Sequence, residues 1–232
     1  IWAMIISAVV IVGYTALGGF LAASTTDLIQ SIIMTIALVI VLVFGINVAG
    51  GMEAVIENAK GVAGYLSLVQ TGNVVTGEAA PYGTITIISM IAWGLGYFGV
   101  PHVLLRFMAI EDDKKLKISR RIATVWVVIS MGVAVLIGIV GYAMTNAGAI
   151  ELFQTSSEAE TLIVRIADLI SQHSFLAALV AGIILSGILA STMSTADSQL
   201  LAAASSVSEN VFKSVFGLKL DEKKTMLLAR LT

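Results

Sequence analysis

Four hydroxyl side chains in the last long apolar segment have the types and spacing of a small cation site. Ser191, Ser194, Thr195 and Ser198 stand at i, i+3, i+4 and i+7, so a helix would place them on one face. Hydroxyl and carbonyl oxygens are hard ligands that suit Na⁺, and no Cys or His is nearby to hold a softer metal. The Ser191 carbonyl would point toward the Ser194 and Thr195 side chains, so these residues could supply three oxygens. The alternative is close helix packing, with each hydroxyl bonded to a carbonyl of its own helix.

A second candidate site is a break within the apolar segment 84–109. Gly94, Gly96 and Gly99 are followed by Pro101, which lacks an N–H and clashes with the preceding helical turn. Transporters use discontinuous helices of this kind, because the freed backbone groups can bind ions and polar groups inside a cavity. The alternative is a simple proline kink, with glycines that allow close helix packing.

Two aromatic residues accompany this break. Trp93, Tyr97 and Pro101 recur at i, i+4 and i+8, and they would share one face if the segment stays helical. Trp and Tyr combine an apolar body with one polar group, which suits a small amphipathic ligand. The alternative is an aromatic belt at the membrane interface, but both aromatic residues lie near the middle of the segment.

Three charged residues accompany the apolar segments. Asp27 either caps a helix that begins near Ser24 or stands at the cytoplasmic mouth of an ion path. Asp197 would point away from Thr195, so we expect it to make a structural contact and not to bind the cation. Arg106 could extend to the membrane interface or pair with an acid.

The elements that must position these residues are membrane-spanning helices. Of the 232 residues, 58% are hydrophobic and 12% are charged, whereas about 25% are charged in a soluble domain. The composition predicts an all-α membrane protein, a multi-span helical bundle. The segments without charges predict spans at about 1–16, 24–49, 84–109, 119–146 and 174–209, with a further helix over 223–232. A tight turn is expected at Gly18 and Gly19, and all 232 residues are expected to form one domain.

The basic residues predict an orientation and argue against other partners. Basic residues concentrate in segments 111–121 and 210–224, which are therefore expected in the cytoplasm. On the outer side, 70–83 is expected to be an irregular loop, and 158–172 either an amphipathic helix along the surface or a structured loop. A net charge of −2 without a dense basic patch argues against nucleic-acid binding, and the absence of Cys excludes disulfides.

The chain resembles sodium/solute symporters over essentially its whole length, and most closely their proline branch. Three stretches carry the resemblance: GYTALGGFLAASTTDLIQ (13–30), WGLGYFGVPH with RFMA (93–109) and ILASTMSTADSQLL (188–201). The resemblance implies the inverted-repeat fold of the bacterial leucine transporter, with a discontinuous helix near 94–101. It also implies that the chain is a central piece, with the family's first discontinuous helix upstream of it.

The resemblance also implies roles for single residues. Ser194 and Thr195 match the paired hydroxyls that bind Na⁺, and Ser191 matches the position whose carbonyl binds the same ion. Asp27 matches an acid important for Na⁺ coupling. The positions that match the family's substrate site are Trp93, Tyr97 and Pro101.

The expected function is Na⁺-coupled symport of a small amino acid, L-proline by resemblance, through alternating access in the cell membrane. Na⁺ is the coupling ion, no other cofactor is expected, and no nucleophile–base pair suggests an enzyme. Val100 stands where the family often has Gln, so another small organic solute is an alternative substrate. A symporter-like sensor domain and a structural membrane subunit are further alternatives. The oligomeric state is not predicted.

Overall fold

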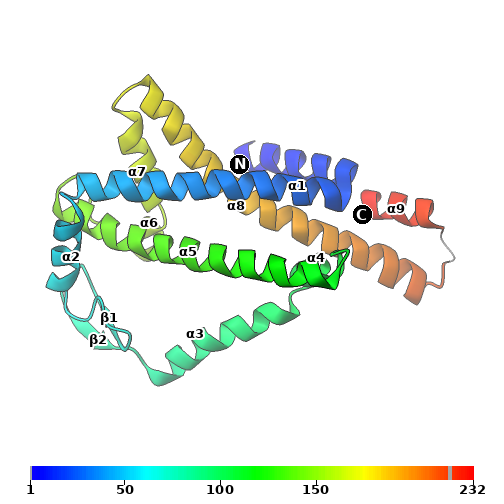
Figure 1. Ribbon diagram of the computed structural model, residues 1–232, viewed down its shortest axis with the longest axis horizontal. Helices are drawn as coiled ribbons and strands as arrows, with labels where there is room; N and C mark the ends of the chain where they lie inside the picture. The colour runs from blue at the N-terminus through cyan, green and yellow to red at the C-terminus, as the bar shows by residue number, and fades with distance from the viewer. Residues whose placement is uncertain (1, 219–220) are drawn as a thin grey trace. The chain divides into compact units, whose positions relative to one another are not determined.

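The computed structural model describes residues 2–218 and 221–232, which are mostly helical (Figure 1). The helices are α1 Trp2–Val48, α2 Met52–Gly61, α3 Thr84–Gly96, α4 Pro101–Met108, α5 Asp113–Asn146, α6 Ser156–Ala159, α7 Leu162–Ser171, α8 Phe175–Ser205 and α9 Glu222–Leu231. A 3₁₀ turn, η1, covers Tyr97–Gly99, and a π-helical segment, η2, continues α8 over Ser206–Val215. Ile1 of the first expected span, and Lys219 and Leu220 of the second basic segment, lie outside the described residues.

Three stretches of helix in the described part are long and apolar enough to cross a membrane. They are Met4–Val48, Asp113–Asn146 and Phe175–Val215, and the broken pair Thr84–Gly96 and Pro101–Met108 is a fourth candidate. Large apolar side chains such as Leu17 and Ile85 are exposed, which suits a lipid environment in which helices satisfy their own backbone groups. The predicted all-α membrane fold is therefore confirmed.

Helix α1 consists of two arms that meet at Gly19. This residue has φ 58° and ψ −151°, a conformation that glycine adopts without the steric cost of a Cβ. Figure 1 shows the chain reversing direction here, from the dark-blue first arm into the blue second arm. The turn expected from Gly18 and Gly19 therefore lies at this break.

The chain divides into two compact units. Unit 1 comprises Ile1–Ile32, Gly96–Asp113 and Ile188–Thr232, and unit 2 comprises Ile33–Leu95 and Lys114–Gly187. The proposed cation ligands and Asp27 belong to unit 1, together with Tyr97 and Pro101, whereas Trp93 belongs to unit 2.

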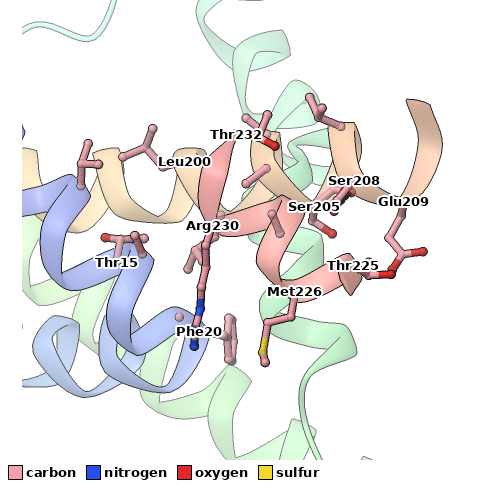
Figure 2. A pocket seen from close by; sticks show the side chains of 18 of the residues that line it. Thr15, Phe20, Leu200, Ser205, Ser208, Glu209, Thr225, Met226, Arg230 and Thr232 are labelled. Carbon is pink, nitrogen blue, oxygen red and sulfur yellow. Dashed lines mark hydrogen bonds between the residues drawn. The ribbon is translucent and has the colours of Figure 1, made fainter. Parts of the chain in front are cut away.

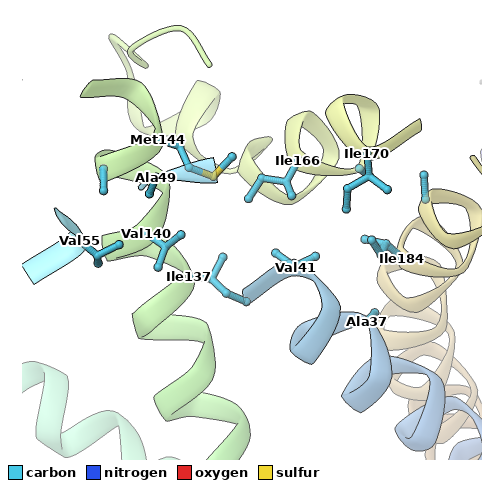
Figure 3. Packing of buried hydrophobic residues seen from close by; sticks show 13 residues of the cluster. Ala37, Val41, Ala49, Val55, Ile137, Val140, Met144, Ile166, Ile170 and Ile184 are labelled. Atoms are coloured by element: carbon cyan, nitrogen blue, oxygen red, sulfur yellow. The ribbon is translucent and has the colours of Figure 1, made fainter. Parts of the chain in front are cut away.

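Unit 2 has a continuous apolar core between its parts of α1, α2, α5, α7 and α8 (Figure 3). Its buried members are Ala37, Val41, Ala49, Val55, Ile137, Val140, Ala143, Met144, Ile166, Ala167, Ile170, Ala181 and Ile184. Two polar contacts add to it, from Trp126 Nε1 to Thr35 Oγ1 at 3.1 Å and from Asn146 Nδ2 to Asn58 Oδ1 at 2.6 Å. This packing makes unit 2 a compact body with a core of its own.

Two connecting segments, 70–83 and 158–172, contain structure that the sequence left open or did not predict. Segment 158–172 contains helix α7, but its apolar face is buried in the core of unit 2 through Ile166, Ala167 and Ile170, so it does not form a membrane-surface face. The irregular loop expected over 70–83 contains a small hairpin, in which β1 Gln70–Gly72 pairs antiparallel with β2 Ala79–Pro81. Strands of three residues are too short to show an alternating pattern in the sequence.

Small residues let the helices of unit 2 approach closely, and one substitution tests this. A Cβ on Gly45 would lie 2.6 Å from Val140 Cγ1, whereas a Cβ on Gly138 would meet nothing within 4 Å. We expect Gly45→Ala to destabilise the protein by about 1–3 kcal/mol, because β-branched Val140 cannot easily move away. Gly138→Ala is the matched control on α5 and is expected to be neutral or slightly stabilising. Equal midpoints of thermal unfolding in detergent for the two variants would contradict this packing.

Candidate functional site

The structure gathers three oxygens of α8 at one point. Ser194 Oγ lies 3.1 Å from the Ser191 carbonyl oxygen and Thr195 Oγ1 lies 3.3 Å from the same atom. We call these three oxygens the hydroxyl cluster. Each hydroxyl donates to the carbonyl, as the packing alternative expected, and the same contacts bring oxygens of the hard type close together. Ser191 and Thr195 are exposed and Ser194 is half-buried, which leaves the oxygens accessible to a cation.

In the part of the chain that the structure describes, acidic and imidazole side chains do not form a competing metal site. Among the described residues, no three His, Cys, Asp or Glu side chains converge on one position. Carboxylate-rich sites for divalent cations are therefore not seen in this part of the chain, and the neutral hydroxyl cluster suits a monovalent ion.

The predicted break in segment 84–109 is present. Helix α3 ends at Gly96, the turn η1 follows, and Val100 is extended with φ −74° and ψ 119° before Pro101 begins α4. Pro at the first position of a helix costs nothing, because its missing N–H would have no intrahelical partner there. The helix is interrupted between Trp93 and Pro101, so the continuous helix on which a common face with Tyr97 would depend is not present.

The glycines of this break do not act in close packing within the described residues. A Cβ on Gly94, Gly96 or Gly99 would meet no atom within 4 Å. The side chains of Trp93 and Tyr97 are 74% and 56% exposed. Within the described residues, the two aromatic side chains of the broken segment are therefore exposed and do not pack in a core.

An ion pair between α4 and α1 contacts α8 one turn after the hydroxyl cluster. Arg106 on α4 contacts Asp27 on the second arm of α1, and the same nitrogen, Nη2, also donates to Ser198 Oγ. Ser198 is the fourth hydroxyl of the helical stripe, and it is 7% exposed. Arg106 thus pairs with an acid, one of the two outcomes that the sequence left open.

The structure corrects the capping interpretation of Asp27. The second arm of α1 is already helical from Gly19 onward, so Asp27 lies inside a helix and cannot cap its start. The hydroxyls of Thr25 and Thr26 instead bond back to the carbonyls of Leu21 and Ala22 at 2.8 and 3.0 Å. An acid within a membrane helix is costly and is therefore a candidate for function.

Asp197 makes the structural contact that its position predicted. Its side chain is fully buried and accepts hydrogen bonds from Tyr14 at 2.8 Å and from Ser198 at 3.2 Å. Tyr14 was not predicted as part of the site. A polar side chain in a charge-free span was the only signal available for it, since its partner lies 183 positions away.

A separate cavity of about 780 Å³ lies elsewhere in unit 1 (Figure 2). It is lined by both arms of α1 around Gly19, by the end of α8 with η2, and by α9, from which Arg230 extends toward Phe20. The cation, substrate and ion-pair residues named above do not line it. We therefore place the candidate site at the hydroxyl cluster and the broken segment.

The fold and these features together define an all-α membrane protein with a discontinuous helix. The sequence model of the sodium:solute symporter family matches residues 1–232. The chain therefore belongs to the sodium/solute symporter family, and the predicted resemblance is confirmed.

Curated relatives agree with this assignment. The osmoregulated proline transporter OpuE of Bacillus subtilis is 37% identical over 99% of this chain and 43% of its own length. The high-affinity proline transporter PutP of the same organism is 36% identical over 96% of this chain and 43% of its own length. Sodium/proline symporter 2 of Staphylococcus saprophyticus is 35% identical over the whole chain and 42% of its own length. The chain thus spans less than half the length of these relatives. No solved structure is significantly similar to it.

Proposed function

We propose that this chain forms the central part of a secondary active transporter that couples Na⁺ entry to uptake of L-proline across the cell membrane by alternating access. Its family membership and the names of its relatives, which are proline transporters and sodium/proline symporters, support this function. The observation that carries the proposal is the hydroxyl cluster, in which hard oxygens converge on one turn of α8. We further propose that the complete transporter has the inverted-repeat fold and no enzymatic activity.

Na⁺ binds at the hydroxyl cluster in this proposal. The Ser191 carbonyl and the Ser194 and Thr195 hydroxyls supply three oxygens, and partner oxygens from another segment complete the coordination. Asp27 participates in ion coupling by placing a negative charge close to α8, where Arg106 also contacts Ser198. One Na⁺ crossing the membrane potential supplies about 2.3 kcal/mol per 100 mV, and its concentration gradient adds to this.

Proline binds at the broken segment in this proposal. Tyr97 and Pro101 flank the extended residue Val100, and Trp93 precedes the break. The aromatic faces suit the apolar pyrrolidine ring, and polar groups of the break suit the charged ends of the amino acid.

The basic segments 111–121 and 210–224 lie in the cytoplasm in this proposal, as the positive-inside rule predicts.

One observation favours a second substrate class. Val100 stands at the extended residue of the break, next to the proposed substrate residues, where the family often has Gln. An apolar side chain at this position would alter the preference for polar parts of the solute. A Na⁺-coupled symporter of another small organic solute is therefore the second candidate.

Competition experiments separate these candidates. The complete protein is reconstituted in liposomes, and Na⁺-driven uptake of labelled L-proline is measured against excess alanine, glycine, acetate or unlabelled proline. We expect unlabelled proline to compete at the lowest concentration. Stronger competition by another solute would make that solute the preferred substrate, and the absence of any Na⁺-driven uptake of labelled proline would contradict proline transport.

A further inference from the structure

We propose that Arg106 is a positioning residue that links the half-helix α4 of the substrate site to α8 of the Na⁺ site. The proposal rests on the proposed function, and it assigns to Arg106 and Ser198 the coupling between the two sites. Neither residue needs to touch Na⁺ or proline for this role.

The position of Arg106 along α4 makes such a link possible. Helix α4 begins at Pro101 beside the break and carries Arg106 in its last turn. One guanidinium nitrogen there contacts both Asp27 of α1 and Ser198 of α8. A short rigid helix with the substrate site at one end and this contact at the other transmits a movement of the break to both neighbours.

Ser198 carries the link into the hydroxyl cluster. Its Oγ lies 2.8 Å from the Ser194 carbonyl oxygen and 3.2 Å from Asp197 Oδ1. A hydroxyl has one proton, so Ser198 can donate to only one of these acceptors at a time. Arg106 therefore contacts a hydroxyl that can donate either to the buried Asp197 carboxylate or to the backbone carbonyl of Ser194, a proposed Na⁺ ligand.

Electrostatics give the same residue a second effect on the ion. The side chain of Asp27 is 11% exposed, and its Oδ1 is buried without a hydrogen-bond partner among the described residues. Opposite charges interact strongly where little water is present, so Arg106 holds the negative charge of Asp27 in place. When Arg106 is lost, that charge is free to attract a cation whatever the position of α4.

Coupling between two ligands is reciprocal, and it can be measured as a ratio. Its size is the dissociation constant of labelled proline at low Na⁺ divided by that at saturating Na⁺. When the ratio is taken from the dissociation constants at these two Na⁺ concentrations, we expect Arg106→Gln and Ser198→Ala to reduce it by about fivefold or more. The ratio of Arg106→Lys is expected to lie between those of the wild type and Arg106→Gln. An ammonium group keeps the positive charge but lacks the planar shape with which a guanidinium group contacts two partners.

The experiment uses the complete protein in liposomes, with Thr192→Ala as the matched control on α8. Thr192 donates to the Ile188 carbonyl at 3.4 Å and lies off the hydroxyl stripe. A ratio that falls in Arg106→Gln and Ser198→Ala, but not in Thr192→Ala, supports the link, because a general loss of stability would not change this ratio selectively. If Arg106→Gln does not fold, Ser198→Ala still decides, because it retains the ion pair.

Two results would overturn the proposal, and they are distinguishable. If the wild-type protein shows Na⁺-dependent proline affinity and Ser198→Ala keeps the wild-type ratio, the link through Arg106 is wrong and the proposed function stands. If the wild-type protein shows no effect of Na⁺ on proline uptake, the proposed function fails and the link fails with it.

Discussion

Replacing both Ser194 and Thr195 with Ala is expected to raise the Na⁺ concentration for half-maximal proline uptake by about tenfold or more. Each hydroxyl supplies one of the oxygens that converge near the Ser191 carbonyl. A polar contact to a charged group contributes roughly 1.5–3 kcal/mol, and about 1.4 kcal/mol corresponds to tenfold in affinity. Uptake of labelled proline as a function of Na⁺ concentration measures the effect.

Two sets of variants make this prediction specific. Ser194→Thr and Thr195→Ser retain a hydroxyl at each position, so they are expected to keep an affinity for Na⁺ closer to that of the wild type. Thr192→Ala removes a hydroxyl from the same helix, outside the cluster, and is expected to change nothing. An unchanged Na⁺ dependence in the double Ala variant would show that the cation binds elsewhere.

Replacing Tyr97 with Ala is expected to raise the Michaelis constant for proline by about tenfold or more at saturating Na⁺. Burying an aromatic side chain against a ligand contributes roughly 1.5–3 kcal/mol, and the 56% exposure of Tyr97 leaves much of its ring available for such a contact. We expect Trp93→Ala to act in the same direction. The proline dependence of uptake, measured at fixed Na⁺, gives the constant.

The contributions of the Tyr97 hydroxyl and of its ring to proline affinity can be measured separately. Tyr97→Phe retains the ring and is expected to cost only a few-fold, the net contribution of about one hydrogen bond. Trp2→Ala is the control. The exposed fraction of Trp2, 78%, is close to the 74% of Trp93, and Trp2 is distant in sequence from the broken segment. If Tyr97→Ala and Trp2→Ala had equal Michaelis constants, the broken segment would not be the substrate site.

Properties that depend on neighbouring residues in the chain were predictable from the sequence. Charge-free runs predicted the apolar helices, because lipid permits no other backbone arrangement for them. Gly19 and the run from Gly94 to Pro101 predicted a turn and a break, because the backbone preferences of Gly and Pro act locally. The spacing of Ser191, Ser194 and Thr195 predicted the hydroxyl cluster, because one helix contains all of its oxygens.

Properties that depend on contacts between helices could not be derived in this way. Arg106 and Asp27 are 79 positions apart, so nothing in their local sequence indicates that they pair. The wrong capping interpretation of Asp27 has the same origin, because the start of its helix is set by the turn at Gly19 and not by the polar run before it. Whether segment 158–172 would pack in a core could not be decided from its sequence, because a buried helix face and a membrane-surface face have the same apolar spacing.

The most direct test of the central claim is uptake of labelled L-proline by the complete protein in liposomes, with and without an inward Na⁺ gradient. The proposed coupling predicts that proline accumulates above its external concentration only while the gradient is present. It also predicts that K⁺ cannot replace Na⁺, since the hydroxyl cluster is proposed as a site for the smaller ion. Proline uptake of equal rate and extent in the absence of the Na⁺ gradient would contradict Na⁺-coupled symport.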